Sequence, residues 1–417
     1  MLIGFRVKNY LSFGDEAVFS FLKNNDICNK NAAIKINEDV ELYKIMVVYG
    51  ANAAGKSNLI NALYSLKKMV VLSAKESVQG EELPVKAFRL NKNGGKEPTE
   101  FSIALYIDGC QYVYNVSLNK FCILKESLSA YPKGREQVWY VREKCENGEY
   151  IWKFGKGLKG NKTLWKTSTR DNALFLSTAV QLNSEQLRVI SNWFANKLVV
   201  LRDSNVREFQ TLSLLENRQE IHQNVVNFLR NADNTLTDIR VIKSKLNDKK
   251  LKGLPQELKD VILKGVGDKE VAEVRTSHVG TEGELVDFSF EEESTGTRKV
   301  FSLAAPFFRA ADNGVVIVAD ELDTHLHPLL YKSLLSFFVG NSGNSQLMFT
   351  THNTSYLSDK NLFDREQIWF VKRNGVSLSS ELYSLGEFKP LADGDENYES
   401  MYLDGRYGAT PKWNNVV

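Results

Sequence analysis

The sequence predicts an α/β protein in which a mixed central sheet with flanking helices is combined with an antiparallel β subdomain. Three observations predict this architecture. A continuous apolar run at 44–49, typical of a buried strand, leads into a glycine-rich loop and a helical pattern from 55 to about 72. Successive strand patterns separated by turn residues occupy 85–131 and favour an antiparallel sheet. A strand–helix–strand unit follows at 315–350.

The individual elements follow from local patterns along the chain. Apolar and polar residues alternate over 2–13, and 16–22 is the expected antiparallel partner of that strand. Apolar residues recur at helical spacing over 183–232, whereas 240–284 is polar, lysine-rich and the least ordered in pattern. The other predicted elements are strands at 101–107, 111–118, 123–131, 315–320, 346–350 and 367–372, and a helix at 328–339.

Composition excludes several classes of protein. The 417 residues are 43% hydrophobic and 25% charged, which is ordinary for a globular protein of about two or three domains and excludes a mainly disordered chain. No apolar run approaches the roughly 18–20 residues that a membrane helix needs, and the N-terminus lacks the features of a signal peptide. We therefore expect a cytoplasmic protein without membrane contact. A reducing compartment also fits the four cysteines, which form no C-x-x-C pair: Cys28, Cys110, Cys122 and Cys145.

The net charge of +2 hides two basic segments. Residues 131–170 hold ten Lys and Arg against four acidic residues, and 240–269 hold nine against four. The first segment also contains Trp139, Trp152 and Trp165. Basic residues interleaved with aromatic ones can follow a phosphate backbone and stack on bases, so both segments are candidates for contact with DNA or RNA. The alternative for 131–170 is a solvated hairpin whose aromatic side chains pack against the neighbouring domain.

The loop at 50–57 is a phosphate-binding candidate. It fits G-x-x-x-x-G-K-[ST] and lies between the strand at 44–49 and a helix, which is the context that this motif requires. The glycines let backbone N–H groups surround phosphates at the positive end of the helix dipole. We expect Lys56 to reach the β- and γ-phosphates of ATP and Ser57 to bind Mg²⁺. The predicted nucleotide-binding residues of this loop are Gly50, Asn52, Gly55, Lys56, Ser57 and Asn58.

Two later strands end in residues suited to phosphate chemistry. Asp320 and Glu321 follow an apolar strand, so we expect Asp320 to hold Mg²⁺ through its water shell and Glu321 to polarise the attacking water. The alternative is that these carboxylates cap the next helix. His352 follows the next strand, where its imidazole could sense the γ-phosphate and orient water. The predicted catalytic residues are therefore Lys56, Glu321 and His352, and the predicted Mg²⁺ ligands are Ser57 and Asp320.

His325 and His327 form an H-x-H pair between these two strands. Such spacing can indicate a metal site, but no cysteine or third histidine lies near in the sequence. We interpret this segment as a turn after the acidic strand that crosses a subunit interface.

The order of phosphate loop, Glu293-Ser-Thr-Gly-Thr297, Asp-Glu and histidine resembles that of ABC-type ATPases in the branch containing RecF, SMC and OLD proteins. More closely, the chain resembles the AAA15 ATP-binding proteins of prokaryotic antiphage and abortive-infection loci, relatives of the RloA-type ATPases. The similarity extends over nearly the whole chain. Its motifs lie at 9–13, 98–101, 172–176, 293–299, 320–328, 350–354 and 402–408.

This resemblance implies that the ATP site is shared between two subunits. Ser294 and Gly296 would form the signature that contacts the γ-phosphate of a nucleotide held by the opposite subunit. Thr295 and Thr297 stand where the transporter pattern L-S-G-G-Q has glycine and glutamine. The expected assembly is a homodimer or higher homo-oligomer that ATP closes and hydrolysis releases.

The resemblance also implies a domain organisation and a function. Residues 1–130 would form the first half of an ABC-type head, 131–285 a basic hairpin and helical segment inserted into it, and 286–417 the second half. The expected function is that of a switch ATPase controlling a separate effector, expected to be a nuclease, in antiphage defence. The segment after His352 is too short for the nuclease domain of OLD proteins, which is why a separate effector is expected. The alternative is a RecF-like DNA-binding ATPase of DNA repair or maintenance.

Overall fold

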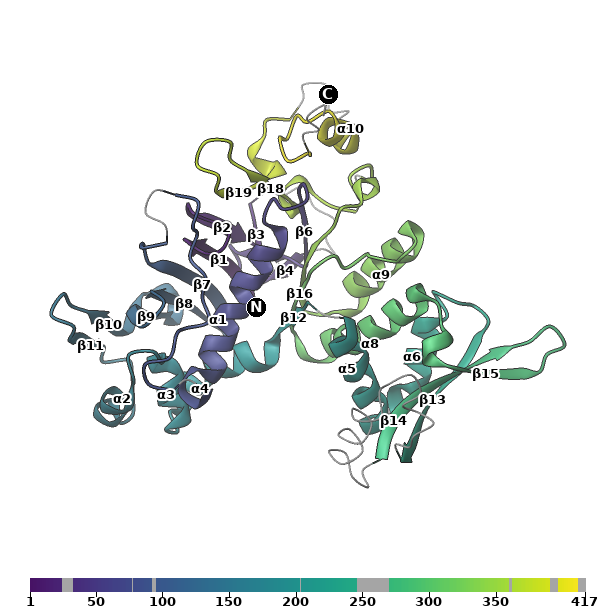
Figure 1. The fold of residues 1–417 in the computed structure, drawn as a ribbon, viewed down its shortest axis with the longest axis horizontal. Helices are drawn as coiled ribbons and strands as arrows, with labels where there is room; N and C mark the ends of the chain where they lie inside the picture. Colours follow the sequence, from purple (N-terminus) through teal and green to yellow (C-terminus); the bar gives the residue numbers. More distant parts are fainter. Residues whose placement is uncertain are drawn as a thin grey trace, which may run out of the picture. The chain divides into compact units, whose positions relative to one another are not determined.

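The structure is a computed structural model that describes residues 1–24, 33–76, 78–91, 95–202, 204–245, 270–359, 362–390 and 397–411. The chain forms two compact units (Figure 1). The first comprises Met1–Arg202, Ala310–Thr324 and Ser336–Val417, and the second comprises Asp203–Arg309 and His325–Leu335. Within the described residues, no helix is both long enough and apolar enough to cross a bilayer.

The central sheet of the first unit has six strands in the order β12-β16-β17-β6-β18-β19. All neighbouring pairs are parallel except β18 with β19. Every residue of β6, β16 and β17 is buried, which explains their continuous apolar sequences. The predicted mixed sheet is therefore confirmed. Its strands are β6 (Ile45–Tyr49), β12 (Leu198–Leu201), β16 (Val316–Ala319), β17 (Gln346–Thr350), β18 (Ile368–Arg373) and β19 (Ser380–Ser384).

A second sheet of the first unit is antiparallel and has seven strands in the order β11-β10-β9-β8-β7-β1-β2. The strand predicted over 2–13 ends at Lys8, because Asn9 and Leu11 adopt positive φ angles of 49° and 51° in a tight turn. The antiparallel β subdomain predicted from 85–131 is confirmed. Its strands are β1 (Leu2–Lys8), β2 (Ala17–Ser20), β7 (Thr99–Ile107), β8 (Cys110–Leu118), β9 (Ile123–Tyr131), β10 (Gln137–Lys144) and β11 (Tyr150–Phe154).

Helix α1 (Lys56–Glu76) joins the two sheets. It packs against β1 of the antiparallel sheet and β12 of the central sheet, and its buried residues belong to one continuous hydrophobic core with both. A small sheet and four further helices complete the unit. They are β3 (Leu22–Lys23), β4 (Ala33–Lys35), β5 (Glu41–Tyr43), α2 (Lys162–Ser168), α3 (Phe175–Gln181), α4 (Glu185–Asn192) and α10 (Tyr398–Leu403).

The basic segment 131–170 continues the antiparallel sheet. Strands β10 and β11 pair beyond β9, so the first unit extends to Arg202, which differs from the predicted division at 131. Trp139 and Trp165 are buried in the core. Trp152 stacks on Phe154 at 5.8 Å and meets Phe175 of α3 at 5.3 Å. The aromatic side chains of the hairpin therefore pack within the first unit, to which the hairpin itself belongs, and not against a neighbouring domain. Trp139 and Trp165 cannot stack on bases.

A buried polar network ties this sheet to α3. Glu126 of β9 and Arg142 of β10 are fully buried, with 3.8 Å between Oε2 and Nη1. Arg142 donates hydrogen bonds to the carbonyl oxygens of Ala173 and Arg170, at 2.8 and 2.9 Å. Glu126 accepts four, from the hydroxyls of Tyr114 and Tyr140 and from the N–H groups of Phe175 and Leu176. The carboxylate therefore sits at the N-terminus of α3, where the helix dipole favours a negative charge.

The second unit combines helices with a three-stranded antiparallel sheet in the order β13-β14-β15. The helical pattern predicted for 183–232 appears as α4 in the first unit and as α5 and α6 in the second. In the segment 240–284, residues 240–245 and 270–279 form strands, and residues 246–269 lie outside the described residues. The cysteine at position 28 also lies outside them. The elements are α5 (Ser204–Asn217), α6 (His222–Leu229), β13 (Leu236–Lys245), β14 (Glu270–Val279) and β15 (Leu285–Ser289). Helices α8 (Thr295–Asn313) and α9 (Pro328–Asn341) each contribute residues to both units.

Candidate functional site

The phosphate-loop candidate lies between β6 and α1, as predicted. Its two glycines are required by space as well as by backbone angle. A Cβ atom at Gly50 would collide with the carbonyl oxygen of Val371, and one at Gly55 would collide with the hydroxyls of Ser380 and Ser12. Gly55 also adopts a φ of 124°, which L side chains rarely adopt. The loop is thus held tightly at both ends by the surrounding strands.

Lys56 is buried and closes the loop. Its Nζ donates hydrogen bonds to the carbonyl oxygens of Gly50 at 2.7 Å and Ala51 at 3.1 Å. Burial lowers the pKa of Lys56 to about 8, against the opposing attraction of Asp320 and Glu321. The ammonium group is therefore a desolvated cation that a phosphate group could draw away from the loop.

The acidic pair begins where β16 ends, and β17 holds it in place. The Thr350 hydroxyl donates to Asp320 Oδ1 at 2.7 Å and accepts from the N–H of Glu321 at 2.8 Å. Glu321 has a positive φ of 45°, uncommon for a residue other than glycine. The next helix, α9, begins only at Pro328, so the alternative that these carboxylates cap it does not fit.

His352 follows β17 and faces the same carboxylates. Its Nε2 lies 3.8 Å from Glu321 Oε1. Burial and the charge of Lys56 lower the pKa of His352, while Glu321, Asp323 and Asp320 act in the opposite direction. The ring is therefore mainly neutral at pH 7 and can accept as well as donate a hydrogen bond.

A cavity of about 900 Å³ brings three of the predicted residues together. Phosphate-loop residues 51–54, including Asn52, line it together with Glu321 and His352. Because the carboxyl ends of parallel strands meet at one edge of a sheet, β6, β16 and β17 deliver these groups to the same place. Ser57 is exposed at the start of α1.

Sequence reasoning missed another wall of this cavity. Lys372 and Arg373 from β18 line it, as do residues 408–411. Tyr402 anchors this last segment by donating to the carbonyl oxygen of Ala409 at 3.2 Å and by stacking on Phe370 at 5.5 Å. Two features of the sequence could have indicated this wall: the motif at 402–408, and the cations Lys372 and Arg373 where the strand predicted at 367–372 ends.

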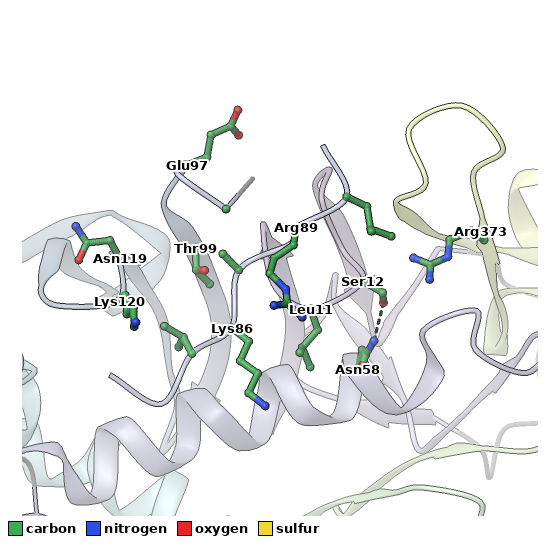
Figure 2. Close-up of a pocket in the computed structure, with 14 residues that line it drawn as sticks. Leu11, Ser12, Asn58, Lys86, Arg89, Glu97, Thr99, Asn119, Lys120 and Arg373 are labelled. Atoms are coloured by element: carbon green, nitrogen blue, oxygen red, sulfur yellow. Dashed lines mark hydrogen bonds between the residues drawn. The ribbon is translucent and has the colours of Figure 1, made fainter. Parts of the chain in front are cut away.

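A second cavity of about 670 Å³ is lined by Asn58, in the first turn of α1, together with Ser12 and Arg373 (Figure 2). The first cavity and this one share Arg373. The predicted nucleotide-binding residue Asn58 lines this second cavity and donates a hydrogen bond to Ser12 Oγ at 2.8 Å. Lys86 and Arg89 add cationic groups to its lining, as Figure 2 shows.

The predicted signature lies in the second unit, at the N-terminus of α8. Ser294 Oγ accepts the N–H of Thr297 at 3.1 Å, and the two hydroxyls lie 2.9 Å apart. Thr297, which stands where transporters have glutamine, is buried by this contact. A Cβ atom at Gly296 would lie 3.4 Å from the carbonyl oxygen of His325. In the part of the chain that the structure describes, neither His325 nor His327 belongs to a cluster of three metal ligands.

A family model described as "AAA domain, putative AbiEii toxin, Type IV TA system" matches residues 45–359, which contain every predicted site residue. Among solved structures, the chain is similar to three SMC head domains, each at 13% identity over 92% of this chain. One is the SMC head domain from Thermotoga maritima; the match covers 98% of that chain, with a TM-score of 0.40. Another is the Smc head domain with an extended coiled coil bound to the C-terminal domain of ScpA, derived from Pyrococcus furiosus; the match covers 96% of that chain, with a TM-score of 0.45. The third is an SmcHead bound to the C-winged helix domain of ScpA; the match covers 97% of that chain, with a TM-score of 0.44. No curated protein matches the sequence.

Proposed function

We propose that this chain, which belongs to that AAA-domain family, is an Mg²⁺-dependent switch that binds and hydrolyses ATP. The observation that carries the proposal is the cavity of about 900 Å³ lined by the phosphate loop, Glu321 and His352. A phosphate-binding loop facing a carboxylate and an imidazole has the groups that ATP hydrolysis needs.

The phosphates of ATP bind to the backbone N–H groups of the loop, at the N-terminus of α1. Lys56 leaves the carbonyl oxygens of Gly50 and Ala51 and pairs with the β- and γ-phosphates. The exposed hydroxyl of Ser57 and the carboxylate of Asp320 offer hard oxygen ligands, which fit Mg²⁺. When bound, the ion neutralises charge that develops on the transferred phosphoryl group.

Glu321 accepts the proton of the attacking water, and His352 orients that water toward the γ-phosphate. The Thr350 hydroxyl supports this arrangement because it contacts both the Mg²⁺ ligand Asp320 and the backbone of the base Glu321. The second cavity receives the nucleoside end, with Arg373 between the two ends of the nucleotide.

A closed dimer completes each site. Ser294 and Gly296 of one subunit contact the γ-phosphate bound by the phosphate loop of the other. The position of Ser294 directly before α8 supports this assignment, because the N-terminus of a helix favours an anion. ATP then favours the closed dimer, since only that state makes both sets of contacts.

A mixing experiment tests the shared site. Lys56→Ala and Ser294→Arg chains should each lack ATPase activity, but an equal mixture should regain about a quarter of the wild-type rate. Half of the dimers in the mixture are heterodimers, and each of these has one intact composite site. Phosphate release from the two pure variants and the mixture measures this. A mixture as inactive as its components would contradict the shared site.

The affinity for ATP should fall as pH rises through about 8. Only the protonated form of Lys56 attracts phosphate, and the pKa of Lys56 in the free protein is about 8. Between pH 7.5 and 9.5 the dissociation constant should therefore increase on the order of tenfold. Calorimetric titration with a non-hydrolysable ATP analogue measures it. Lys56→Arg is the matched control, because its guanidinium stays charged and should give a flat profile. A flat wild-type profile would count against the role of Lys56.

We further propose that the ATP-dependent closure controls a separate effector, a nuclease, in cytoplasmic antiphage defence. The family description as a type IV toxin–antitoxin component supports this, as does the resemblance to AAA15 and RloA-type proteins. The RecF-like alternative is weaker, because Trp139 and Trp165 are buried and cannot stack on bases. Co-purification with the product of the neighbouring gene, with and without ATP, tests the effector role. The absence of any complex would refute it.

A further inference from the structure

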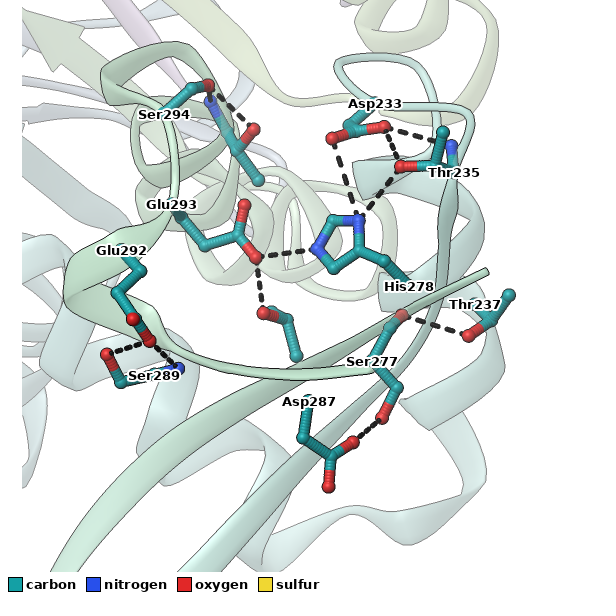
Figure 3. Close-up of polar contacts among 12 residues, drawn as sticks. Asp233, Thr235, Thr237, Ser277, His278, Asp287, Ser289, Glu292, Glu293 and Ser294 are labelled. Atoms are coloured by element: carbon teal, nitrogen blue, oxygen red, sulfur yellow. Dashed lines mark hydrogen bonds and ion pairs between the residues drawn. The ribbon is translucent and has the colours of Figure 1, made fainter. Parts of the chain in front are cut away.

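The second unit contains a cluster of potential metal ligands that the proposed ATPase chemistry does not use. Asp233 precedes β13, His278 lies on β14, and Glu293 directly precedes Ser294 (Figure 3). Each offers one ligand atom, and the three atoms lie within 4.8 Å of one another. His278 Nε2 is 2.7 Å from Glu293 Oε1, and His278 Nδ1 is 3.7 Å from Asp233 Oδ2. Three segments far apart in sequence thus converge on one point.

Neighbouring groups hold each of the three side chains in place. The N–H and the hydroxyl of Thr235 donate to Asp233 Oδ1, at 2.9 and 2.6 Å. The Thr276 hydroxyl donates to Glu293 Oε1. The ring of Phe288 meets His278 edge to face at 5.1 Å. Supporting contacts of this kind orient ligands around protein-bound metals.

The hydrogen bonds also offer a place for a cation beside His278 Nε2. Thr235 has one hydroxyl proton, which points to Asp233, so its oxygen must accept from His278 Nδ1 at 2.9 Å. His278 Nε2 faces the carboxylate of Glu293, which only accepts. A cation bound by both His278 Nε2 and the Glu293 carboxylate would satisfy this contact while Nδ1 donates to Thr235.

The burial of these three side chains also favours a bound cation. The side chains of Glu293, His278 and Asp233 are 5%, 12% and 32% exposed. Two carboxylates this close and this buried are costly unless a positive charge balances them. A cavity of about 390 Å³ opens beside them, lined in part by Val286 and Phe288, and gives access and room for a water ligand.

We propose that Asp233, His278 and Glu293 bind a divalent transition-metal ion and that Zn²⁺ fits the site best. One imidazole and two carboxylates suit Zn²⁺, whereas Ca²⁺ and Mg²⁺ prefer oxygen ligands alone. Ligand atoms around tetrahedral Zn²⁺ lie about 3.3 Å apart, so the three candidate atoms, which lie within 4.8 Å of one another, would have to draw closer together to bind one ion. With a neutral imidazole, the ion balances the two carboxylates.

The ion would fix the start of α8 to β14, because Glu293 is bonded to Ser294. Its effect on ATP turnover through Ser294 rests on the proposed function. Binding of the metal itself does not, so the two claims can fail separately.

The test uses the full-length protein after treatment with a chelator. Calorimetric titration with Zn²⁺ should show one site per chain, and Co²⁺ should give the visible absorption of tetrahedral coordination. His278→Gln and the near-isosteric Asp233→Asn should each weaken Zn²⁺ binding at least about 100-fold. His222→Gln is the matched control, since His222 lies 3.2 Å from Asp238 but belongs to no three-ligand cluster among the described residues.

The outcomes are distinct. Zn²⁺ binding by the wild type and His222→Gln but not by His278→Gln or Asp233→Asn supports the site, provided that circular dichroism shows both variants folded. Absent binding, or equal binding by His278→Gln, overturns it. If Zn²⁺ binds but does not change the ATPase rate of the wild type, only the link to Ser294 is lost.

Discussion

Replacement of Glu321 by glutamine should lower the rate of ATP hydrolysis by about 10²- to 10⁴-fold and leave ATP binding intact. The amide cannot accept the proton of the attacking water. It keeps the size of the side chain, and the Thr350 contact to the backbone of residue 321 does not depend on the carboxylate. ATP should then hold the dimer closed, since the step that opens it is blocked.

Three measurements separate these effects: phosphate release at saturating ATP, affinity for a non-hydrolysable analogue, and dimer mass by light scattering in the presence of ATP. Glu146→Gln, at an exposed position in the turn between β10 and β11, makes the same chemical change and should leave all three at wild-type values. Hydrolysis at the wild-type rate would refute the assignment of the base. Loss of analogue binding would instead show that Glu321 supports the fold of the site. The trapped dimer is also the best bait for the effector.

Glu126→Ala should destabilise the first unit by about 3–5 kcal/mol, the largest stability effect we expect from a single polar side chain. The variant leaves Arg142 as a buried charge without its partner and removes the acceptor of four hydrogen bonds. Urea unfolding followed by tryptophan fluorescence measures the change, because Trp139 and Trp165 lie in the same core.

A matched pair of variants tests the cause of that loss. Glu143→Ala removes the partner of Lys125 on the exposed part of β10 and should change the unfolding midpoint little. Glu126→Leu combined with Arg142→Met should recover part of the stability lost in Glu126→Ala, since no lone charge stays buried. A Glu126→Ala midpoint equal to that of Glu143→Ala would show that the buried pair contributes nothing.

The parts of the site that sequence predicts are those encoded by local patterns. The phosphate loop, Asp320, Glu321 and His352 each follow a continuous apolar run, and the ends of parallel strands meet at one sheet edge. The catalytic roles of these residues are still predictions, as is the Mg²⁺ site. The mixed sheet and the antiparallel subdomain follow from the same periodicities and are confirmed.

What sequence does not predict depends on contacts between distant segments. Lys372 and Arg373 reach the main cavity only because β18 pairs with β6. The domain boundary predicted at 131 lies where the composition becomes basic. The first unit nevertheless continues past this point, because β10 pairs with β9. The convergence of Asp233, His278 and Glu293 depends on the pairing of β13 with β14 and has no local pattern.

Arg373 has a consequence for how the ATP molecule is recognised. Arg373 lines both the cavity proposed for the phosphates and the cavity proposed for the nucleoside. Two halves of a ligand that share a side chain do not have independent binding energies, and their separate affinities do not add up to the whole. Under the proposed binding mode, adenosine and triphosphate are recognised as one ligand, and we expect compounds that carry only one of these ends to bind much more weakly than ATP.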